Sequence, residues 1–220
     1  MNFLDDLLFF IYPKSCGICK KIENNFLCEK CERKLKTSEL FVNQIIDYEK
    51  DRTKYFDEHA FVFKYDSIIR DKIIQYKFNN KAYLSKMFFE FFVKNKKICG
   101  FLKKYDIIIP VPMTYKKIKE RGYNQTQLIA KEIAKNIDIE LCDDALIKTK
   151  NTIAQSKLNK NKRKQNLKGA FRVLDLEKIQ GKNILLFDDI FTTGSTVNEC
   201  SKILKKAGAK TVGVLTIAKD

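Results

Sequence analysis

The chain has 220 residues, a length that suits one medium-sized domain with a small additional module. Its 43 lysines and arginines against 27 acidic residues give a formal charge of +16, which favours polyanionic partners such as nucleic acid or an anionic membrane surface. A lysine-, asparagine- and isoleucine-rich composition also follows from A/T-biased coding, so the charge alone leaves DNA binding open. The seven cysteines are odd in number and include two CxxC pairs, which fits a metal site in a reduced, cytoplasmic compartment better than a disulfide framework.

The N-terminal stretch, residues 2–12, is apolar and is followed by Pro13. It contains Asp5 and Asp6, has no basic leader, and is too short to span a bilayer, so we expect no transmembrane segment. We interpret it as a helix that packs against the next module. A helix that lies on a membrane surface is the alternative.

Two CxxC pairs come next, formed by Cys16 with Cys19 and Cys28 with Cys31. Four thiolates close a tetrahedral site with no open position, which is typical of structural rather than catalytic zinc. An iron–sulfur site and a redox dithiol are the alternatives. The spacing therefore predicts a Zn²⁺-binding zinc-finger module within residues 1–40.

The following region mixes unpatterned and patterned segments. Residues 37–57 are polar and weakly patterned, which predicts a linker or irregular loop, and residues 60–65 read as a strand. His59, the single histidine, precedes this strand and is expected at the surface. Residues 67–78 and 82–93 predict two amphipathic helices. Their aromatic residues are expected in the core rather than on a base-stacking platform: Tyr76, Phe78, Phe88, Phe89, Phe91 and Phe92.

A second buried strand is predicted over residues 106–112, where DIIIPVP ends in prolines that stop ladder pairing. A basic loop with Arg121 and Gly122 follows, and then an apolar-faced helix that contains Leu128 and Ile133. A strand, a basic glycine-containing loop and a helix together predict an anion-binding site.

Residues 148–172 carry nine basic residues and no acidic residue. Such a segment does not pack on itself, so we expect it to be mobile until an anion binds, as an active-site lid would be. A solvated basic loop is the alternative. The acid pair Asp143 and Asp144 just before it is interpreted as a turn, because neither a buried strand nor a Gly-rich loop flanks it.

The most informative stretch is NILLFDDIFTTGST, residues 183–196. Residues 184–187 predict a buried parallel strand, and Asp188 and Asp189 follow at its carboxyl end, where open α/β sheets bind ligands. A predicted phosphate cradle comes next, at the N-terminus of a helix that ends near Gly208. The cradle consists of Thr192, Thr193, Gly194, Ser195 and Thr196.

The ligand of this cradle differs from a dinucleotide or a P-loop nucleotide, because neither glycine motif is present. Two carboxylates beside a phosphate cradle suit a ribose 5-phosphate: the acids accept hydrogen bonds from the sugar hydroxyls while the loop binds the phosphate. Residues 211–217 predict a further buried strand, which completes a β-loop-α-β unit.

The stretch over residues 186–196 resembles the phosphoribosyl-pyrophosphate (PRPP) loop of type I phosphoribosyltransferases, and PVP followed by RGYNQ is similar to their pyrophosphate loop. With the QSKL at residues 155–158, the RKQNLKGAF at residues 163–171 and the two CxxC pairs, the chain resembles the ComF (ComFC) family. This resemblance implies an α/β fold for residues 55–220, with a phosphoribosyltransferase-like parallel sheet flanked by helices and an N-terminal zinc finger. It also implies a cytoplasmic role in natural transformation, in contact with imported single-stranded DNA and the DNA-uptake machinery at the inner membrane.

The resemblance further implies that PRPP binds with Mg²⁺. Asp188 and Asp189 would hold the ribose hydroxyls, the cradle would bind the 5-phosphate, and Arg121 and Arg163 would neutralise the leaving pyrophosphate. A wall over an acceptor base is expected from residues 37–60 or from the zinc module. Two rival functions remain open: purine or pyrimidine salvage, and a DNA-binding adaptor with a vestigial PRPP loop.

Overall fold

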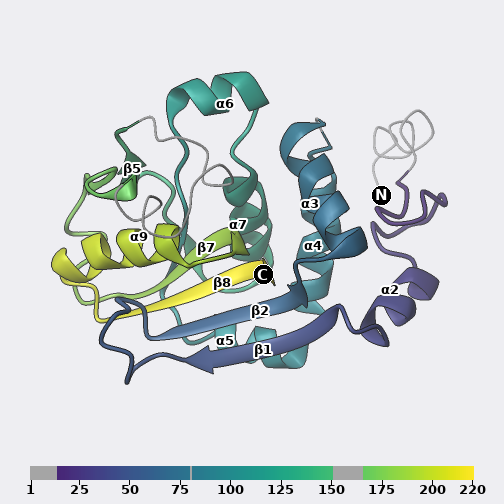
Figure 1. The fold of residues 1–220 in the computed structure, drawn as a ribbon, viewed down its shortest axis with the longest axis horizontal. Helices are drawn as coiled ribbons and strands as arrows, with labels where there is room; N and C mark the ends of the chain where they lie inside the picture. The colour runs from purple at the N-terminus through teal and green to yellow at the C-terminus, as the bar shows by residue number, and fades with distance from the viewer. Residues whose placement is uncertain (1–13, 80, 151–165) are drawn as a thin grey trace.

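The computed structural model describes residues 14–79, 81–150 and 166–220 (Figure 1). The helix predicted over residues 2–12 lies outside these described residues, and so does Arg163 together with most of the predicted lid.

A six-stranded sheet forms the centre of the described chain, with the strand order β1-β2-β8-β7-β3-β4. All neighbouring strands are parallel except β1, which pairs antiparallel to β2 at one edge. The strands are β1 (Phe41–Asp47), β2 (Glu58–Lys64), β3 (Ile107–Pro110), β4 (Glu140–Leu141), β7 (Asn183–Phe191) and β8 (Thr211–Lys219). This mostly parallel sheet with flanking helices confirms the predicted fold class.

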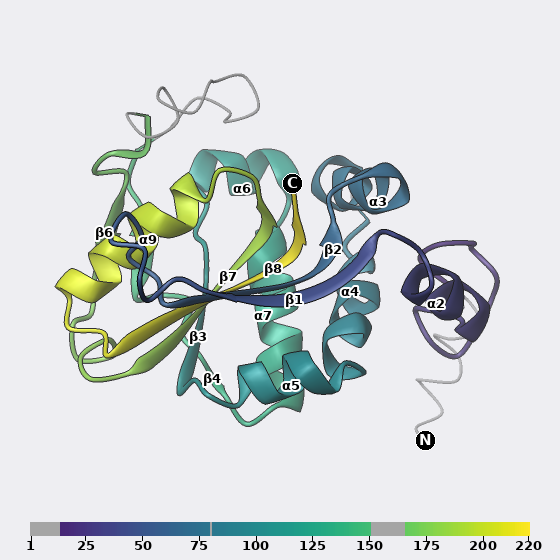
Figure 2. The same ribbon diagram turned by 60° about the horizontal axis from the view of Figure 1, so that its bottom comes forward.

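The central strands are buried on both faces, as their unbroken apolar runs predict. Side chains alternate along β7: Leu185 and Phe187 face one hydrophobic core, while Ile184 and Leu186 face the other. Figure 2 shows the two layers, with α9 on one side of the sheet and α4, α5 and α7 on the other.

The structure contains seven labelled helices in its described residues, and the apolar periodicity of the sequence predicts several of them. They are α2 (Glu29–Lys36), α3 (Ser67–Phe78), α4 (Leu84–Val93), α5 (Lys96–Leu102), α6 (Tyr115–Arg121), α7 (Gln125–Asn136) and α9 (Ser195–Lys206). The predictions over residues 67–78 and 82–93 are confirmed as α3 and α4. The loop predicted after β3 instead contains the short helix α6.

The prediction of an irregular linker over residues 37–57 was wrong, because residues 41–47 form the edge strand β1. Much of β1 is only half-buried, and its register with β2 shifts near Asn43, which has φ +48°. This irregular edge strand lacks the clean alternation that marks a strand in sequence.

The prediction that His59 lies at the surface was also wrong. His59 is on β2 with 0% of its surface exposed, and its ring stacks on Phe191 with centroids 4.2 Å apart. Its Nε2 lies 2.9 Å from Thr216 Oγ1, and the Thr216 hydroxyl donates to the Ala218 carbonyl oxygen at 3.2 Å. His59 is therefore part of the core beneath the carboxyl edge of the sheet.

A small antiparallel sheet joins the two ends of the basic segment, residues 148–172. Strand β5 (Leu146–Lys148) pairs with β6 (Phe171–Val173), so that Lys148 lies opposite Phe171. Asp143 and Asp144 precede this hairpin as an irregular turn, as predicted. None of the helices in the described part of the chain is both long and apolar enough to cross a membrane.

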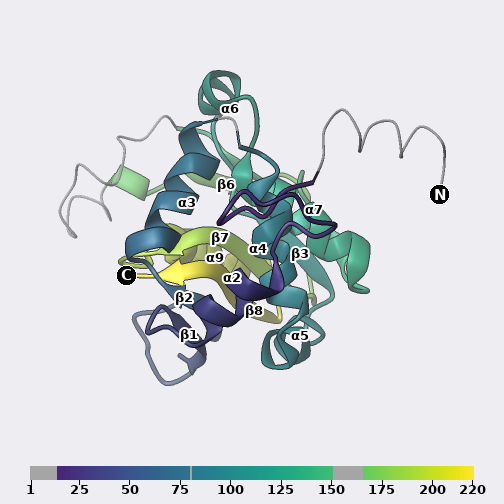
Figure 3. The same cartoon turned by 90° about the vertical axis from the view of Figure 1, so that its right-hand side faces the viewer.

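The cysteine-bearing segment packs against α3 and α4 (Figure 3). Lys72 Nζ on α3 donates to the Ile18 carbonyl oxygen at 3.3 Å, and the Phe26 amide donates to Glu90 Oε1 on α4 at 2.9 Å. Leu27 is buried in the same hydrophobic core as these helices. The N-terminal segment is therefore continuous with the core on the α3 side of the sheet.

Candidate functional site

The two acids of the PRPP-like stretch lie inside β7 rather than after it, because ladder pairing with β8 continues to Phe191. Asp188 is opposite Thr216 in this register. Since successive side chains of a strand alternate between faces, Asp188 points toward α9 and Asp189 toward α3 and α7. The two carboxylates therefore have different surroundings.

Asp189 is 5% exposed, and two side chains bind one of its oxygens. Lys77 Nζ, at the end of α3, lies 2.8 Å from Asp189 Oδ2, and Gln125 Nε2, at the start of α7, donates to the same oxygen at 2.9 Å. The Gln125 Oε1 in turn accepts a hydrogen bond from Arg121. Gln125 thus links the acid of β7 to the arginine of the predicted pyrophosphate loop.

Asp188 is half-buried, and its Oδ1 accepts the Asp189 amide hydrogen at 2.8 Å. Desolvation, followed by repulsion from Asp189, raises the pKa of Asp188 to about 7, against the opposing charges of Lys77 and Lys148. Asp188 is therefore the acid of the pair whose charged form is disfavoured by its surroundings. Lys148 is itself half-buried, and its pKa is lowered first by burial and then by the charge of Lys117.

The predicted cradle forms an irregular bend over residues 192–194 and continues into the first two residues of α9. All of its residues except Thr193 line a small pocket together with Asp188. Thr193 Oγ1 and Ser195 Oγ are 2.8 Å apart, and Gly194 occupies the N-cap position with φ +69°. The first turn of α9 contains no acidic residue, and Gly194 offers no side chain to cap it. No acidic side chain in the first turn of α9 therefore balances the positive end of the helix dipole.

Gly194 is required in this turn for two reasons. Its backbone is left-handed, and a Cβ atom at this position would overlap the Phe191 ring. Phe191 is held from below by His59, so the buried histidine supports the floor of the cradle.

The predicted pyrophosphate loop places Arg121 beside the acid pair. Its guanidinium carbon lies 5.0 Å from the centroid of the Phe78 ring, and Nη1 approaches Met113 Sδ at 3.7 Å. Burial lowers the pKa of Arg121, although a guanidinium remains charged at neutral pH. Gly122 then ends α6 in a left-handed conformation with φ +85°.

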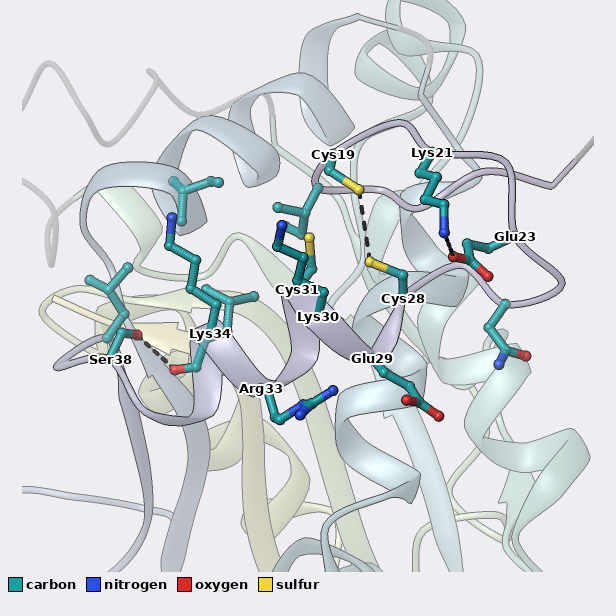
Figure 4. Close-up of a pocket in the computed structure, with 15 residues that line it drawn as sticks. Cys19, Lys21, Glu23, Cys28, Glu29, Lys30, Cys31, Arg33, Lys34 and Ser38 are labelled. Atoms are coloured by element: carbon teal, nitrogen blue, oxygen red, sulfur yellow. Dashed lines mark hydrogen bonds and ion pairs between the residues drawn. The ribbon is translucent and has the colours of Figure 1, made fainter.

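The four predicted metal ligands are brought together: the sulfur atoms of Cys16, Cys19, Cys28 and Cys31 all lie within 4.8 Å of one another. Cys19 Sγ and Cys28 Sγ are 3.8 Å apart (Figure 4), and zinc–sulfur bonds of about 2.3 Å put tetrahedral ligands about this far apart. None of the seven cysteines forms a disulfide. The cluster therefore fits a metal ion such as zinc.

Sequence reasoning missed several residues around the acid pair. Lys77 and Gln125 were not assigned a role, and Phe78 was expected in the core although it is 69% exposed. Phe78 is the last residue of α3 and follows Lys77. An aromatic residue at a helix end beside a charged residue predicts an exposed ring only weakly. The pairing of Lys77 with Asp189 has no local signal, because it depends on how α3 packs over the sheet.

Comparison with known proteins gives matches over most of the chain. Competence protein F of Haemophilus influenzae is 29% identical over 211 residues, which cover 90% of this chain and 92% of that protein. Competence protein ComFC of Streptococcus pneumoniae is 26% identical over 209 residues, which cover 95% of this chain and 82% of that protein. The DNA utilization protein YhgH of Shigella flexneri is 38% identical over 109 residues, about half of each chain (50% and 47%).

Residues 126–220 match the phosphoribosyl transferase domain family. Among solved structures, the glutamine PRPP amidotransferase of B. subtilis is similar with a TM-score of 0.44 and 15% identity, over 65% of this chain and 30% of that one. The sequence matches and the four-cysteine cluster agree with one another. Over most of its length the chain is thus similar to the competence proteins F and ComFC, and its C-terminal part matches the phosphoribosyl transferase domain family.

Proposed function

We propose that this chain binds PRPP together with Mg²⁺ at the carboxyl edge of β7 and acts in natural transformation, where it handles imported single-stranded DNA. The observation that carries the PRPP part is the placement of Asp188 in the same small pocket as the turn before α9. A carboxylate and a helix N-terminus with no acidic residue in its first turn are two features that suit a ribose 5-phosphate.

Each part of PRPP has a candidate partner in this arrangement. The backbone N–H groups at the start of α9 and the hydroxyls of Thr193 and Ser195 suit the 5-phosphate. Asp188 and Asp189 suit the ribose hydroxyls as hydrogen-bond acceptors. Arg121 and the basic residues at the described ends of the predicted lid, such as Lys148, suit the pyrophosphate. Arg163, which lies outside the described residues, stays a predicted further partner.

In a transfer reaction, a nucleophile would displace pyrophosphate from C1 of the ribose while positive charge develops on the sugar ring. The carboxylates of Asp188 and Asp189 would stabilise that charge, and their fixed positions on a buried strand would orient the sugar. Mg²⁺, if bound with PRPP, would help to neutralise the charge of the pyrophosphate. Burial raises the pKa of Cys200 beneath the site well above its ordinary value, so its thiol stays protonated and no covalent intermediate is assigned to it.

Calorimetric titration of PRPP in the presence of Mg²⁺ tests the proposal. Wild type should bind, whereas Asp188→Asn and Asp189→Asn should each weaken binding by about tenfold to a hundredfold, the value of one or two charge-assisted hydrogen bonds. Asp143→Asn and Asp144→Asn are matched controls, since this second acid pair lies in an exposed turn. Absence of binding to wild type would refute the proposal.

The DNA part of the proposal has separate support. The similar proteins are named for competence and DNA utilization, and the chain carries a charge of +16. A groove of about 980 Å³ runs beside the cysteine cluster (Figure 4). Its lining includes the acidic Glu23 and Glu29, and Glu23 is paired with Lys21 at 2.9 Å. The remaining basic lining residues, Lys30, Arg33 and Lys34, suit a phosphate backbone.

Salt dependence of single-stranded DNA affinity tests this part. Contacts to several phosphates should give a steep fall of affinity with salt, and Lys30→Gln combined with Arg33→Gln should reduce that slope by about 1.4, or 0.7 per removed contact. Lys182→Gln combined with Lys210→Gln removes the same charge far from the groove and should leave the slope nearly unchanged. A flat slope for wild type would argue against DNA handling by this chain.

A further inference from the structure

A group of three lysines lies where the cysteine-bearing segment packs on α3 and α4. The lysines are Lys20, which follows Cys19, Lys72 on α3, and Lys81 in the connection between α3 and α4. Burial, and then the charges of Lys20 and Lys81, lowers the pKa of Lys72, so the three cations are close enough to interact. Such a group of like charges is unfavourable unless an anion lies nearby.

The oxygen atoms that these lysines bind within the described residues are all neutral. Lys72 Nζ donates to the Ile18 carbonyl oxygen, Lys20 Nζ to the Tyr83 hydroxyl, and Lys81 Nζ to Gln75 Oε1. None of the three lysines forms an ion pair with an acidic side chain in the described part of the chain. Their compensating anion is therefore a group other than a carboxylate.

Lys72 is the member of this group that most needs such an anion. It is 6% exposed, and it is the one lysine or arginine that is buried in the described residues. A buried ammonium group is costly unless a negative charge is close to it. The Ile18 oxygen that it binds at 3.3 Å lies between Cys16 and Cys19, so its ammonium group is directed at the first CxxC pair.

The four-cysteine cluster is an anion when a metal is bound. Four thiolates around a divalent ion leave two net negative charges, and Cys16, at 0% exposure, keeps this charge away from water. The loop of the first pair is also packed tightly on α4, because a Cβ atom at Gly17 would lie 2.5 Å from Met87 Sδ. The negative charge of Cys16 acts on Lys72 more strongly than that of Asp71 does.

The solvent side of the cluster offers less compensation. Lys21 is the lysine there whose charge interacts with Cys28 and Cys19, but its stronger interaction is with Glu23, at 2.9 Å. Its side chain is 73% exposed, so water and salt screen its charge. The buried Lys72 is screened much less, and its effect on the cluster is correspondingly larger.

We propose that Lys72 is a positioning residue of the metal site, whose ammonium group compensates the charge of the metal-bound thiolates and fixes the first CxxC loop on α3. Lys20 and Lys81 add to the same positive field from the rim of the contact. This inference rests on metal binding by the four cysteines and is independent of PRPP and DNA binding.

The test measures the zinc affinity of the full chain by competition with a chromophoric chelator. Lys72→Met keeps the length of the side chain and removes its charge. It should weaken zinc binding about tenfold to a hundredfold, the usual effect of removing a partner outside the ligand shell. Lys72→Arg keeps the charge and should bind zinc more tightly than Lys72→Met. The absorption spectrum of the Co²⁺-loaded variants should stay that of a tetrahedral four-thiolate site, which shows that the ligands are intact.

Lys86→Met is the matched control. Lys86 is an exposed lysine of α4 that also contacts the cysteine-bearing segment, with Nζ at 5.2 Å from the centroid of the Phe26 ring. Its removal takes away the same charge without uncovering a buried thiolate, so zinc affinity should stay at the wild-type value.

Thermal unfolding separates charge compensation from simple packing. In excess zinc, Lys72→Met should have a lower Tm than wild type. In a chelator the order should reverse, because Lys72 is then a buried cation without its anion and methionine is better suited to the position. A lysine that only packs would change Tm in the same direction under both conditions.

Equal zinc affinities of wild type and Lys72→Met would overturn the inference, and so would a Tm change of the same sign with and without zinc. If inorganic phosphate then raised the Tm of wild type but not of Lys72→Met, the three lysines would be a site for an external anion instead. A wild type that binds no zinc would refute the metal site itself, so the two failures are distinguishable.

Discussion

Lys77 Nζ lies 2.8 Å from Asp189 Oδ2, and both side chains are largely buried, at 19% and 7% exposure. The pair joins the end of α3 to the strand that carries the acid pair. Because Gln125 donates to the same oxygen, Asp189 is held in one orientation before any ligand arrives. A fixed carboxylate loses less entropy when it binds a sugar hydroxyl than a mobile one would.

Replacing Lys77 by methionine should destabilise the protein, because it leaves a buried carboxylate without its cation. The expected loss is about 3 kcal/mol in the free energy of unfolding, measured in urea. Lys178→Met is the control, since Lys178 and Asp144 form a 2.6 Å pair with side chains 41% and 66% exposed, and it should cost less than about 1 kcal/mol. Equal losses in the two variants would show that the buried pair contributes no more to the free energy of unfolding than the exposed pair does.

Gly194→Ala should disturb the turn that we assign to the 5-phosphate. The left-handed backbone costs a non-glycine residue about 1–2 kcal/mol, and overlap of the new Cβ with the Phe191 ring adds to this. Gly181→Ala has a similar φ of +73° but meets nothing within 4 Å, so it isolates the backbone cost. We expect Gly194→Ala to be the less stable variant and to lose PRPP affinity, which urea unfolding and calorimetry measure. If Gly194→Ala bound PRPP with wild-type affinity, the turn would not be part of the PRPP site.

His59 should make stability depend on pH. Burial, and then the charge of Lys219, lowers the pKa of His59 to about 3, whereas an unfolded histidine titrates near 6.5. The unfolded state therefore binds the extra proton, so the stability contribution is full above about pH 6.5 and is lost as pH falls toward 3. Between pH 7.5 and pH 5 the loss should reach about 2 kcal/mol.

The measurement is the difference between wild type and His59→Gln in urea unfolding across this pH range. Glutamine can keep a hydrogen bond to Thr216 but does not titrate. The comparison is needed because Asp188, whose pKa is raised, contributes with the opposite sign over part of the same range. Parallel pH profiles for the two proteins would contradict the assignment of a neutral buried histidine.

Metal analysis should find about one zinc per chain, because four thiolates complete one tetrahedral site. Cys28→Ser should lose the metal and lower Tm, since metal binding and folding of the site are coupled. Cys99→Ser is the control: Cys99 lies on α5, outside the cluster, and should retain the metal. A metal-free wild type with an unchanged Tm in a chelator would show that the cluster is not a structural metal site.

Elements with strong local signals were predictable from the sequence. Strands β7 and β8 are apolar runs buried on both faces, and α3 begins and ends at the expected residues. The edge strand β1 was not predictable in this way, because a half-buried strand with a register shift has neither a continuous apolar run nor a clean alternation.

The candidate site was only partly predictable. The hydroxyl-rich turn and the acid pair are adjacent in sequence, so their proximity was expected. The surroundings of each acid depend on contacts between distant segments, such as Lys77 with Asp189 and Gln125 with Asp189. His59 was misplaced for the same reason, because its partner Thr216 is 157 residues away. The local sequence pattern identifies the side chains that can bind a ligand. Tertiary packing decides which of these side chains are also paired with other residues of the protein.

The position of both acids within a regularly paired strand has an evolutionary consequence. Inserting or deleting one residue before Asp188 in β7 would turn Asp188 toward Lys77 and Asp189 toward α9, since the period of a strand is two. Such a length change would exchange the faces of the sheet on which the two carboxylates lie, although both aspartates would still be present. Related chains should therefore vary in length in their loops while β7 keeps a constant count of residues up to the acids.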